Sequence, residues 1–554
     1  MQPLEVISAR AVSDGNKKAF AFLKLGGKEF SDFQTLTWME VYKKTLQYGE
    51  FLRGLSQLRR GDRIAIIAKN GPEWVLADIA AMASGFVTVP LSTQATLTEL
   101  QFCLSEAGVK VVFCDQKNTE LDSGILQITF AELETGILGL DGNFAPSPLA
   151  IDEMNTLIYT SGTNGQPKGV MHSMLAFSNA YQAIYRTFQI KFSDVFLSYL
   201  PLSHVAERIL IEFTGIYSGA TIYFVDQIEK VVHQLPKVRP TIFLAVPRVW
   251  DTMRFRIERE FAQNPILEKR LSHVPGFLRR FILSKFLKKK LGFDRARILV
   301  SGAAKLSLET IETFSRFGIQ ICEAYGLTET LGVTSMNIPK QLHRGSVGKA
   351  CPGVFLRLMP DGEICIKSSF LFLGYYKRPQ ETAEALQNGW FHSGDIGKID
   401  AGGYLIITDR KKNIFKTLHG KYVAPLPIEI SFKNHPAIRE ILVIGESRPH
   451  CVALASVDEK NLDEKMLSTL LERINSRLAP HEQIKSLGCI SSSWETSSGE
   501  MTASMKLKRR VVLEKYQQQI EDLYSSRSRV KFFTPNANEV KKMEKEKIAD
   551  TRFQ

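Results

Sequence analysis

The sequence predicts an α/β protein: a large N-terminal domain of α/β sheets with a β-rich subdomain, then a small α/β C-terminal domain. Three observations carry this prediction. First, 554 residues are too many for one hydrophobic core. Second, short, continuous apolar runs alternate with helix-length segments, which is typical of buried strands in α/β sheets. Third, strand-like segments follow one another closely between about residues 362 and 410, as in β-hairpins.

The buried-strand runs end at Gly, Pro, Asp or Asn, residues that break strands. They are RIAIIAKN from Arg63, VKVVFCD from Val109, TIYFVD from Thr221, TIFLAVP from Thr241 and ARILVSG from Ala296. The longest apolar stretch, from Val75 to Leu91, contains an Asp, a Ser, a Gly and a Pro. It therefore predicts a helix, a turn and a strand rather than a membrane span, which needs about 18 uninterrupted apolar residues.

The pattern of predicted helices and strands changes after residue 361. GEICIKS, GWFHSGDIGKID and GYLIITDRKKN predict the hairpins of the β-rich subdomain, and EILVIGE, CVALASVD and the helical EKMLSTLLERINSRL follow. We therefore expect a large domain over residues 1–410, with the β-rich subdomain at about 345–410. We also expect a small domain over residues 411–515. It is followed by a helical or loose polar tail over residues 516–554.

Composition narrows the class of protein. An apolar content of 44% with 23% charged residues is typical of a globular protein. The first residues lack the basic-then-apolar layout of a secretory signal. Seven cysteines without CxxC spacing argue against a disulfide framework or a zinc site, so a cytoplasmic location is expected. The net charge of +13 allows binding of nucleotides, CoA or anionic lipid. No nucleic-acid-binding module is present, and no nucleic-acid partner is expected.

The segment LIYTSGTNGQPKGVMHS, Leu157 to Ser173, suits a polyphosphate ligand. Glycines let backbone N–H groups approach oxygen atoms, hydroxyl groups donate hydrogen bonds, and the ammonium group of Lys168 balances charge. The segment is not a Walker A loop, because Pro167 stands where that motif requires its second Gly.

Four later segments match one superfamily in the same order as this loop. They are AYGLTET (324–330), GWFHSGDIGKID (389–400), ITDRKKNIFKTLHGKYVAPLPIE (407–429) and MTASMKLKRR (501–510). Together they resemble the adenylate-forming superfamily of acyl-CoA synthetases, luciferases and peptide-synthetase adenylation domains. YLPLSHVAER from Tyr199 and RPTIFLAVPRVWDTM from Arg239 resemble the long-chain and bubblegum-type fatty acyl-CoA synthetases within it.

The resemblance implies a role for each matching position, and ATP, Mg²⁺ and CoA as substrates or cofactors. Tyr325 is expected against adenine, Thr328 at the α-phosphate, Glu329 at Mg²⁺, and Asp395 and Arg410 at the ribose. Lys506 would be the mobile lysine that reaches the acyl carboxylate and the α-phosphate, and Lys412 the hinge of a mobile C-terminal domain. The expected catalytic residues are Lys506, Thr328 and Glu329. The expected ATP-binding loop comprises Thr160 (also a candidate Mg²⁺ ligand), Ser161, Gly162, Thr163, Asn164, Gly165 and Lys168.

The function that the resemblance implies is an ATP-dependent long-chain fatty acid–CoA ligase. It would form an acyl-adenylate and then a CoA thioester, releasing pyrophosphate and AMP. Two alternatives stay open: a fatty acyl-AMP ligase that loads an acyl carrier protein, and a non-catalytic lipid-binding or scaffold protein. The sequence departs from its relatives at Leu418-His419, where long-chain synthetases usually carry small residues, and this puts the thioester step in question.

One further segment, FLRRFILSKFLKKKLGF (277–293), predicts a helix with an apolar face and a basic complement. Its apolar residues, Phe277, Leu278, Phe281, Ile282, Phe286 and Leu287, fall roughly on one side. Such a helix either packs against the core or rests on anionic lipid. The enzyme is therefore expected to be cytoplasmic, with possible peripheral contact at the inner face of the membrane.

Overall fold

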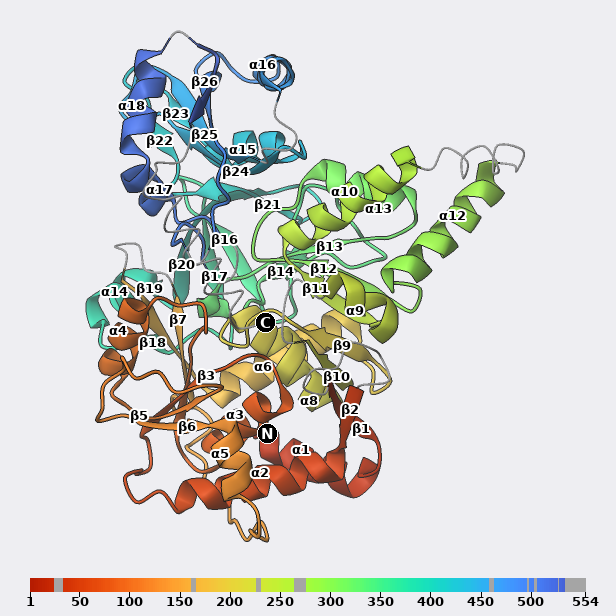
Figure 1. Ribbon diagram of the computed structural model, residues 1–554, viewed down its shortest axis with the longest axis vertical. Coiled ribbons are helices and arrows are strands. Elements are labelled where there is room, and N and C mark those ends of the chain that lie inside the picture. The colour runs from red at the N-terminus through yellow and green to blue at the C-terminus, as the bar shows by residue number, and fades with distance from the viewer. Residues whose placement is uncertain are drawn as a thin grey trace. The chain divides into compact units, whose positions relative to one another are not determined.

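The computed structural model describes residues 1–23, 33–160, 166–225, 231–263, 276–457, 463–495, 498–502, 506–526 and 528–533, without the side chains of 260–263 and 276–281. The chain forms two compact units (Figure 1). The first contains Met1–Ser393 and Lys398–Ile406, and the second contains Gly394–Gly397 and Ile407–Gln554. The expected mixed α/β fold, with a large N-terminal and a small C-terminal part, is confirmed.

The largest sheet of the first unit has seven strands in the order β18-β8-β7-β4-β3-β5-β6. Strands β7, β4, β3, β5 and β6 run parallel, whereas β8 is antiparallel to both β7 and β18. The strands predicted at Arg63 and Val109 lie inside this sheet, each with a neighbouring strand on both sides. The bounds are β3 Arg63–Ile67, β4 Val87–Pro90, β5 Val109–Cys114, β6 Leu126–Thr129, β7 Thr156–Thr160, β8 Lys168–His172 and β18 Gly374–Tyr375.

Two further sheets of this unit contain the strands predicted at Thr221, Thr241 and Ala296. One has the order β2-β1-β10-β9, and the other the order β11-β12-β13-β14-β15. Strands β11, β12 and β13 are parallel to one another, so their carboxyl ends lie at one edge. The bounds are β1 Lys18–Leu23, β2 Phe33–Thr37, β9 Val195–Ser198, β10 Thr221–Phe224, β11 Ile242–Ala245, β12 Ile298–Ser301, β13 Cys322–Tyr325, β14 Ser335–Met336 and β15 Lys349–Ala350.

The predicted β-rich segment forms an antiparallel sheet. Its order is β16-β17-β20-β19, and β21 also pairs with β20. Both the β16–β17 and the β19–β20 connections are short, as the hairpin prediction required. The bounds are β16 Phe355–Leu358, β17 Glu363–Lys367, β19 Leu386–Gln387, β20 Trp390–Ile399 and β21 Leu405–Arg410.

Local sequence signals start several helices of the first unit. Helices α2, α4 and α5 each begin at a capping box in which Thr37, Thr96 or Thr129 bonds to a Glu three residues on. A cap of this kind contributes about 1 kcal/mol. Helix α3 confirms the helix predicted in the Val75–Leu91 stretch but begins earlier, at Pro72, and has its apolar side chains buried on every face. The bounds are α1 Pro3–Asp14, α2 Trp38–Arg53, α3 Pro72–Ala83, α4 Leu97–Ala107, α5 Phe130–Gly136, α6 Met174–Phe188, α7 Val205–Glu207, a π-helix Arg208–Phe213, α8 Thr214–Ser218, α9 Val231–Val238, α10 Pro247–Gln263, α12 Gly276–Leu291, α13 Leu308–Arg316 and α14 Pro379–Ala385.

The second unit is built on the four-stranded sheet β24-β25-β26-β27 and a small pair, β22-β23. The predicted strands EILVIGE and CVALASVD and the predicted helix after them are present. The bounds are β22 Phe415–Lys416, β23 Tyr422–Val423, α15 Pro425–Lys433, β24 Ile438–Ile444, β25 Cys451–Val457, α16 Glu464–Asn475, β26 Ile484–Ile490, α17 Arg509–Lys515, α18 Gln517–Ser525 and β27 Val530–Phe533.

A helical or loose polar tail was expected from residue 516, and the structure has helix α18 and strand β27 in this region. Helix α18 buries Ile520 and Leu523, and β27 pairs in parallel with β26. The compact unit therefore extends at least to Phe533. This unit also includes Gly394–Gly397, and its continuous part begins at Ile407 rather than after residue 410.

Helix α12 confirms the helix predicted near residues 277–293, but its described side chains do not form one apolar face. Leu287 and Leu291 are buried, whereas Ile282 is 44% and Phe286 is 52% exposed. Each pair is spaced four residues apart, so the helix presents one apolar stripe inward and another outward. Among the described residues, no helix combines the length and the apolar character needed to cross a bilayer.

Candidate active site

The predicted phosphate loop connects two strands whose ends the structure describes. Strands β7 and β8 pair in antiparallel register, which places Thr160 opposite Lys168. The Thr160 hydroxyl donates to the Lys168 carbonyl at 3.5 Å. Ser161, Gly162, Thr163, Asn164 and Gly165 lie outside the described residues. The described ends therefore place the Thr160 hydroxyl and the Lys168 ammonium group close to where the loop begins and ends.

The Lys168 ammonium group has an acidic and aromatic neighbourhood. It forms an ion pair with Glu381 of α14 and lies 5.3 Å from the centre of the Tyr375 ring. Glu381 also pairs with Arg378 at 3.2 Å. The hydrogen bond from Lys168 is the main reason that the pKa of the Glu381 carboxyl lies below its usual value. Lys168 is therefore a cation that already holds an anionic partner, and a phosphate would compete with that carboxylate.

The segment after β13 makes a tight turn that only glycine allows. A Cβ on Gly326 would lie 2.1 Å from the backbone of Gly332, so the two chain segments touch there. Between them, Thr328–Thr330 forms a single 3₁₀ turn, and Leu331 ends it in the left-handed conformation at φ 49°. The turn leaves Thr328 and Glu329 partly exposed directly after the buried Tyr325.

Three contacts fix this turn to other parts of the first unit. The ring nitrogen Nε2 of His172 lies 2.9 Å from the Thr328 carbonyl oxygen. The backbone N–H of Phe372 donates to the Glu329 carbonyl at 2.9 Å, and the Tyr375 hydroxyl donates to the Glu329 carboxylate at 2.7 Å. The Thr328 carbonyl is thus held by β8, and the backbone and carboxylate of Glu329 by the segment around β18.

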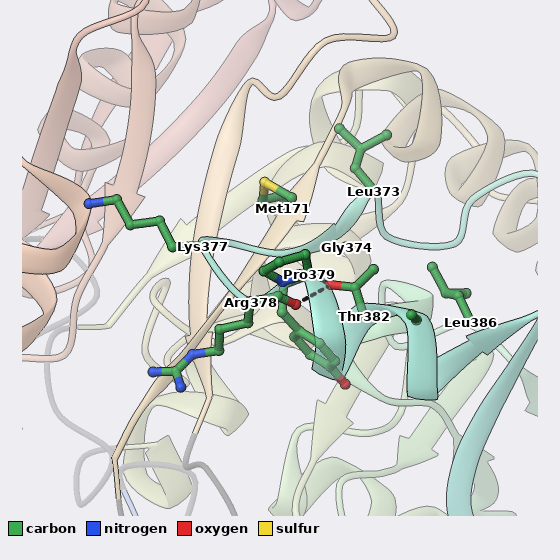
Figure 2. A pocket seen from close by; sticks show the side chains of 10 residues that line it. Met171, Leu373, Gly374, Lys377, Arg378, Pro379, Thr382 and Leu386 are labelled. Carbon is green, nitrogen blue, oxygen red and sulfur yellow. Dashed lines mark hydrogen bonds between the residues drawn. The ribbon is translucent and has the colours of Figure 1, made fainter.

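A pocket of about 490 Å³ lies beside these contacts (Figure 2). Its lining is mostly apolar and comes from β8, β18 and α14, where Thr382 bonds to the backbone of Tyr375 and Arg378. None of the predicted site residues lines it, and it has no part in the chemistry described below.

The second unit holds the remaining predicted residues. Asp395 is almost fully buried and forms an ion pair with Arg410 at 2.9 Å. The adjacent Asp409 is also buried, and burial raises the pKa of its carboxyl although three hydrogen bonds oppose this. Lys412 lies exposed in the turn after β21. The structure thus brings the two predicted ribose contacts, Asp395 and Arg410, together.

Lys506 lies beside an isolated β-bridge of the second unit. Met501 and Leu507 form an antiparallel bridge, and Thr502 and Lys506 exchange two hydrogen bonds across it. The Thr502 N–H donates to the Lys506 carbonyl at 2.8 Å, and the Lys506 N–H donates to the Thr502 hydroxyl at 3.0 Å. The exposed Lys506 side chain is therefore carried on a defined backbone.

Comparisons with known proteins match both units. The sequence model of AMP-binding enzymes matches residues 8–376, and that of the AMP-binding enzyme C-terminal domain matches residues 412–528. The chain belongs to the AMP-binding enzyme family. This confirms the superfamily that the five motifs indicated.

Individual members of the AMP-binding family agree with this assignment. A putative fatty-acid–CoA ligase of Mycobacterium tuberculosis is 33% identical over 441 residues, which cover 70% of this chain and 76% of the relative. A long-chain-fatty-acid–CoA ligase of Mycobacterium bovis is 29% identical over 84% of this chain and 89% of its own. The crystal structure of an anthranilate CoA ligase in complex with anthranoyl-AMP is 18% identical and covers 94% of this chain and 98% of its own, with a TM-score of 0.78. At that identity the likeness shows a shared fold.

Three residues of this AMP-binding enzyme were not predicted: His172, Tyr375 and Glu381. His172 contacts Thr328, Tyr375 contacts Glu329, and Glu381 contacts Lys168. The two residues of each pair lie 46 to 213 positions apart in the sequence. His172 does stand within the quoted loop segment, but nothing in its spacing signals a partner at Thr328.

Proposed function

We propose that this protein is an ATP-dependent long-chain fatty acid–CoA ligase. The observation that carries the proposal is the retention in one chain of two cations, Lys168 and Lys506, the Glu329 carboxylate and the Asp395–Arg410 pair. The relatives named as fatty-acid–CoA ligases support the choice of acid. The M. tuberculosis and M. bovis relatives match 70% and 84% of this chain.

The residues of the first unit suit a magnesium nucleotide. Glu329 supplies a hard oxygen, Thr328 a hydroxyl donor and Lys168 a positive charge, and the Tyr325 ring is apolar enough to lie against a base. Mg²⁺ typically binds to one or two carboxylates together with substrate phosphates, so a single well-held Glu329 is sufficient protein ligation, with Thr160 as the second candidate ligand. Bound there, Mg²⁺ would neutralise charge on the phosphates.

The first step is adenylation. A carboxylate oxygen of the acid attacks the α-phosphorus of ATP, and the bond to the pyrophosphate oxygen breaks. We assign to Lys506 and Thr328 the stabilisation of negative charge at the α-phosphate, and to Asp395 and Arg410 the binding of the ribose hydroxyls. Such a reaction needs little covalent work from the protein and depends on positioning and charge.

The second step transfers the acyl group to a thiol. The sulfur of CoA, having lost its proton, attacks the carbonyl carbon of the acyl-adenylate, and AMP leaves. We propose that the second unit moves between the two steps about a hinge at Lys412, in an exposed turn. Conformational steps of this kind concentrate their backbone changes in very few residues.

The test is release of pyrophosphate and AMP with palmitate and MgATP, measured with and without CoA. We expect CoA-dependent turnover that Lys506→Ala abolishes. Arg510→Ala is the matched control, because it removes one positive charge from the same segment, on an exposed side chain. Equal loss in both variants would contradict the role of Lys506.

The alternatives give different outcomes in the same assay. A single turnover of pyrophosphate release that CoA does not affect would favour a ligase that loads an acyl carrier protein. Leu418, at which the sequence departs from long-chain synthetases and puts the thioester step in question, is 66% exposed on the β22–β23 hairpin. Binding of ATP without release for any acid from C2 to C20 would favour a non-catalytic lipid-binding or scaffold protein.

We also propose peripheral contact of α12 with anionic lipid. Ile282 and Phe286 are exposed on this helix beside the exposed Lys285 and Lys289, a pattern that suits a lipid surface. In vesicle pelleting with phosphatidylserine, Lys285→Glu combined with Lys289→Glu should release the protein. Lys43→Glu with Lys110→Glu is the control with the same charge change on other exposed positions. Equal pelleting of both variants and the wild type would contradict the contact.

A further inference from the structure

His172 is the last residue of β8 and is completely buried. Its backbone is fixed in the sheet, because it pairs with Thr156 and its carbonyl accepts the N–H of Asn155 at 2.9 Å. Its ring packs edge-on against Phe177 with 6.0 Å between the ring centres. The position of the imidazole is thus set by the strand on one side and the core on the other.

The protonation of this imidazole follows from its surroundings. Burial, helped by the Arg208 cation, lowers the pKa of His172 to about 3, although the contact with the Thr328 carbonyl favours the protonated ring. The ring is therefore neutral at physiological pH. A carbonyl oxygen only accepts, so the single ring proton is on Nε2 and points at Thr328. The other nitrogen, Nδ1, is buried and has no hydrogen-bond partner among the described residues.

The Thr328 carbonyl has two acceptor positions, and the structure uses both. The N–H of Leu331 donates at 3.0 Å within the 3₁₀ turn, and His172 donates at 2.9 Å from outside it. The peptide unit that contains this carbonyl joins Thr328 to Glu329. A displacement of that unit would carry both α-carbons, and with them the Thr328 hydroxyl and the Glu329 carboxylate.

Strand β8 also carries Lys168, four residues before His172. An extended strand advances about 3.3 Å per residue, so the two α-carbons are separated by about 13 Å of rigid backbone. His172 therefore ties the turn with Thr328 and Glu329 to the same strand that presents Lys168. The strand sets the spacing between the ammonium group and the turn before a nucleotide arrives.

We propose that His172 is a positioning residue for adenylation: its Nε2–H holds the Thr328 carbonyl, and thereby fixes the Thr328 hydroxyl and the Glu329 carboxylate relative to Lys168. The inference rests on the proposed function for the roles of those three residues. It adds a residue that contacts no substrate and acts through the backbone of the turn.

The test compares three variants. His172→Leu removes the donor and keeps an apolar side chain, and His172→Gln keeps an N–H donor on a side chain of similar reach. Phe177→Leu is the matched control, because it loosens packing on the opposite side of the imidazole and leaves the hydrogen bond in place. Thermal unfolding of all three reports the purely structural cost.

We expect His172→Leu to lower the kcat of adenylation about 30-fold and to change the KM for ATP by less than about threefold, since an interaction that matters in the transition state acts on kcat. His172→Gln should recover most of this loss, and Phe177→Leu should lower the melting temperature without lowering kcat. A kcat for His172→Leu within twofold of wild type would overturn the proposal. The proposal would also be overturned if His172→Gln had a kcat as low as that of His172→Leu while both variants had the same melting temperature.

A second measurement does not depend on activity. Hydrogen exchange of the peptide covering 325–334 should be faster in His172→Leu than in wild type, and should return to the wild-type rate in His172→Gln. Wild-type protein that releases no pyrophosphate with any acid would end the proposed function, whereas unchanged exchange in His172→Leu would end the positioning role. The two failures are therefore separate results.

Discussion

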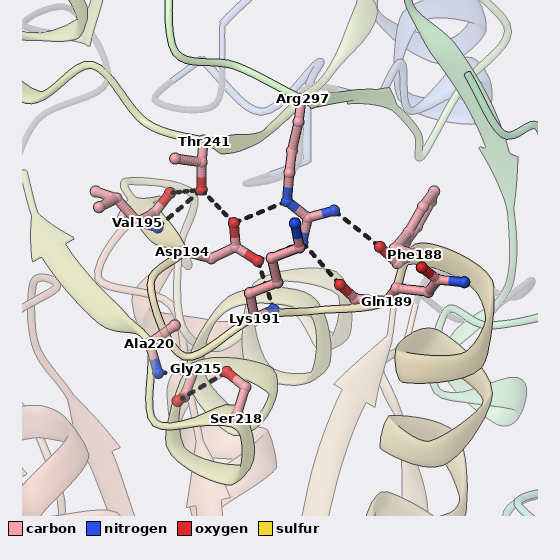
Figure 3. Close-up of polar contacts among 10 residues, drawn as sticks. All are labelled: Phe188, Gln189, Lys191, Asp194, Val195, Gly215, Ser218, Ala220, Thr241 and Arg297. Carbon is pink, nitrogen blue, oxygen red and sulfur yellow. Dashed lines mark hydrogen bonds and ion pairs between the residues drawn. The ribbon is translucent and has the colours of Figure 1, made fainter. Parts of the chain in front are cut away.

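Arg297 allows a stability prediction whose size follows from its contacts (Figure 3). It precedes β12, and its guanidinium binds Asp194 through Nε at 2.8 Å and through a second, shorter contact. It also donates to the carbonyls of Phe188 and Gln189 at the end of α6. Asp194 accepts from the Thr241 hydroxyl at 2.7 Å. One arginine thus joins α6 to the starts of β9, β11 and β12.

The variant Arg297→Ala leaves a carboxylate that is only 3% exposed without its cation. Removing one partner of a buried ion pair costs about 3–5 kcal/mol. The guanidinium itself is 27% exposed, and Thr241 and the Lys191 N–H still bond to Asp194, so we expect the low end, about 3 kcal/mol. Unfolding entropy is about 2.1 cal/mol/K per residue, or roughly 0.8 kcal/mol/K for a unit of about 400 residues. The melting temperature should therefore fall by about 3–4 °C.

The assay is thermal unfolding of wild type, Arg297→Ala and Arg239→Ala, the last of which breaks an exposed pair with Asp294. Exposed pairs contribute little, so the control should melt within about 1 °C of wild type. Burial opposes ionisation of Asp194, but the Arg297 hydrogen bond and those of Lys191 and Thr241 hold the pKa of its carboxyl below the usual value.

A group with a lowered pKa stabilises the folded state above its unfolded pKa and loses that contribution as the pH falls through its folded pKa. The difference between wild type and Arg297→Ala should therefore be complete at pH 7 and shrink below about pH 4. The reasoning is refuted if Arg297→Ala melts no lower than Arg239→Ala at pH 7.

Three predictions concern the site. Tyr375→Phe removes the hydroxyl that orients Glu329, so it should lower the adenylation kcat about fivefold. The assay is pyrophosphate release measured over a series of magnesium concentrations. An unchanged rate at every magnesium concentration would contradict this. Glu381→Gln frees Lys168 from a competing anion, so calorimetry should show ATP binding about two- to fivefold tighter at 0.05 M salt and unchanged at 0.5 M. Weaker binding at low salt would instead mean that Glu381 orients the lysine. Lys412→Pro should slow the thioester step at least tenfold more than adenylation in rapid-quench measurements, whereas equal slowing would argue against a hinge.

The central strands could be predicted because each is a continuous apolar run. Strands β3, β5, β10, β11 and β12 begin within two residues of the predicted starts, because a strand packed on both faces is apolar at most positions. The exposed Lys110 of β5 is an exception. Strand β27 was missed for the opposite reason. It is as long as β10, β11 and β12 but stands in a stretch of mixed charge, so only its pairing with β26 shows it to be a strand.

The residues around the predicted site could not be found in the same way. Tyr375 reaches Glu329 because β18 pairs with β8, a contact between segments about 200 residues apart. No local pattern encodes such a pairing, and β18 itself has only two residues. The motifs therefore identify the groups proposed to meet the substrate, whereas the groups that hold them, His172 and Tyr375, emerge only from the sheet.

The parallel strands β11, β12 and β13 have the residue proposed for stability at one edge and the turn proposed for chemistry at the other. Arg297 stands at the amino end of β12, whereas the turn with Thr328 follows the carboxyl end of β13, the edge at which α/β sheets bind ligands. Among the described residues, Arg297 and His172 have no contact partner in common, and substitutions without shared partners usually have additive effects. Arg297→Ala combined with His172→Leu should therefore show the melting loss of the first variant added to that of the second, and the kcat loss of the second alone. An additional loss of kcat in the double variant would mean that the amino edge of the sheet also sets the geometry of the turn.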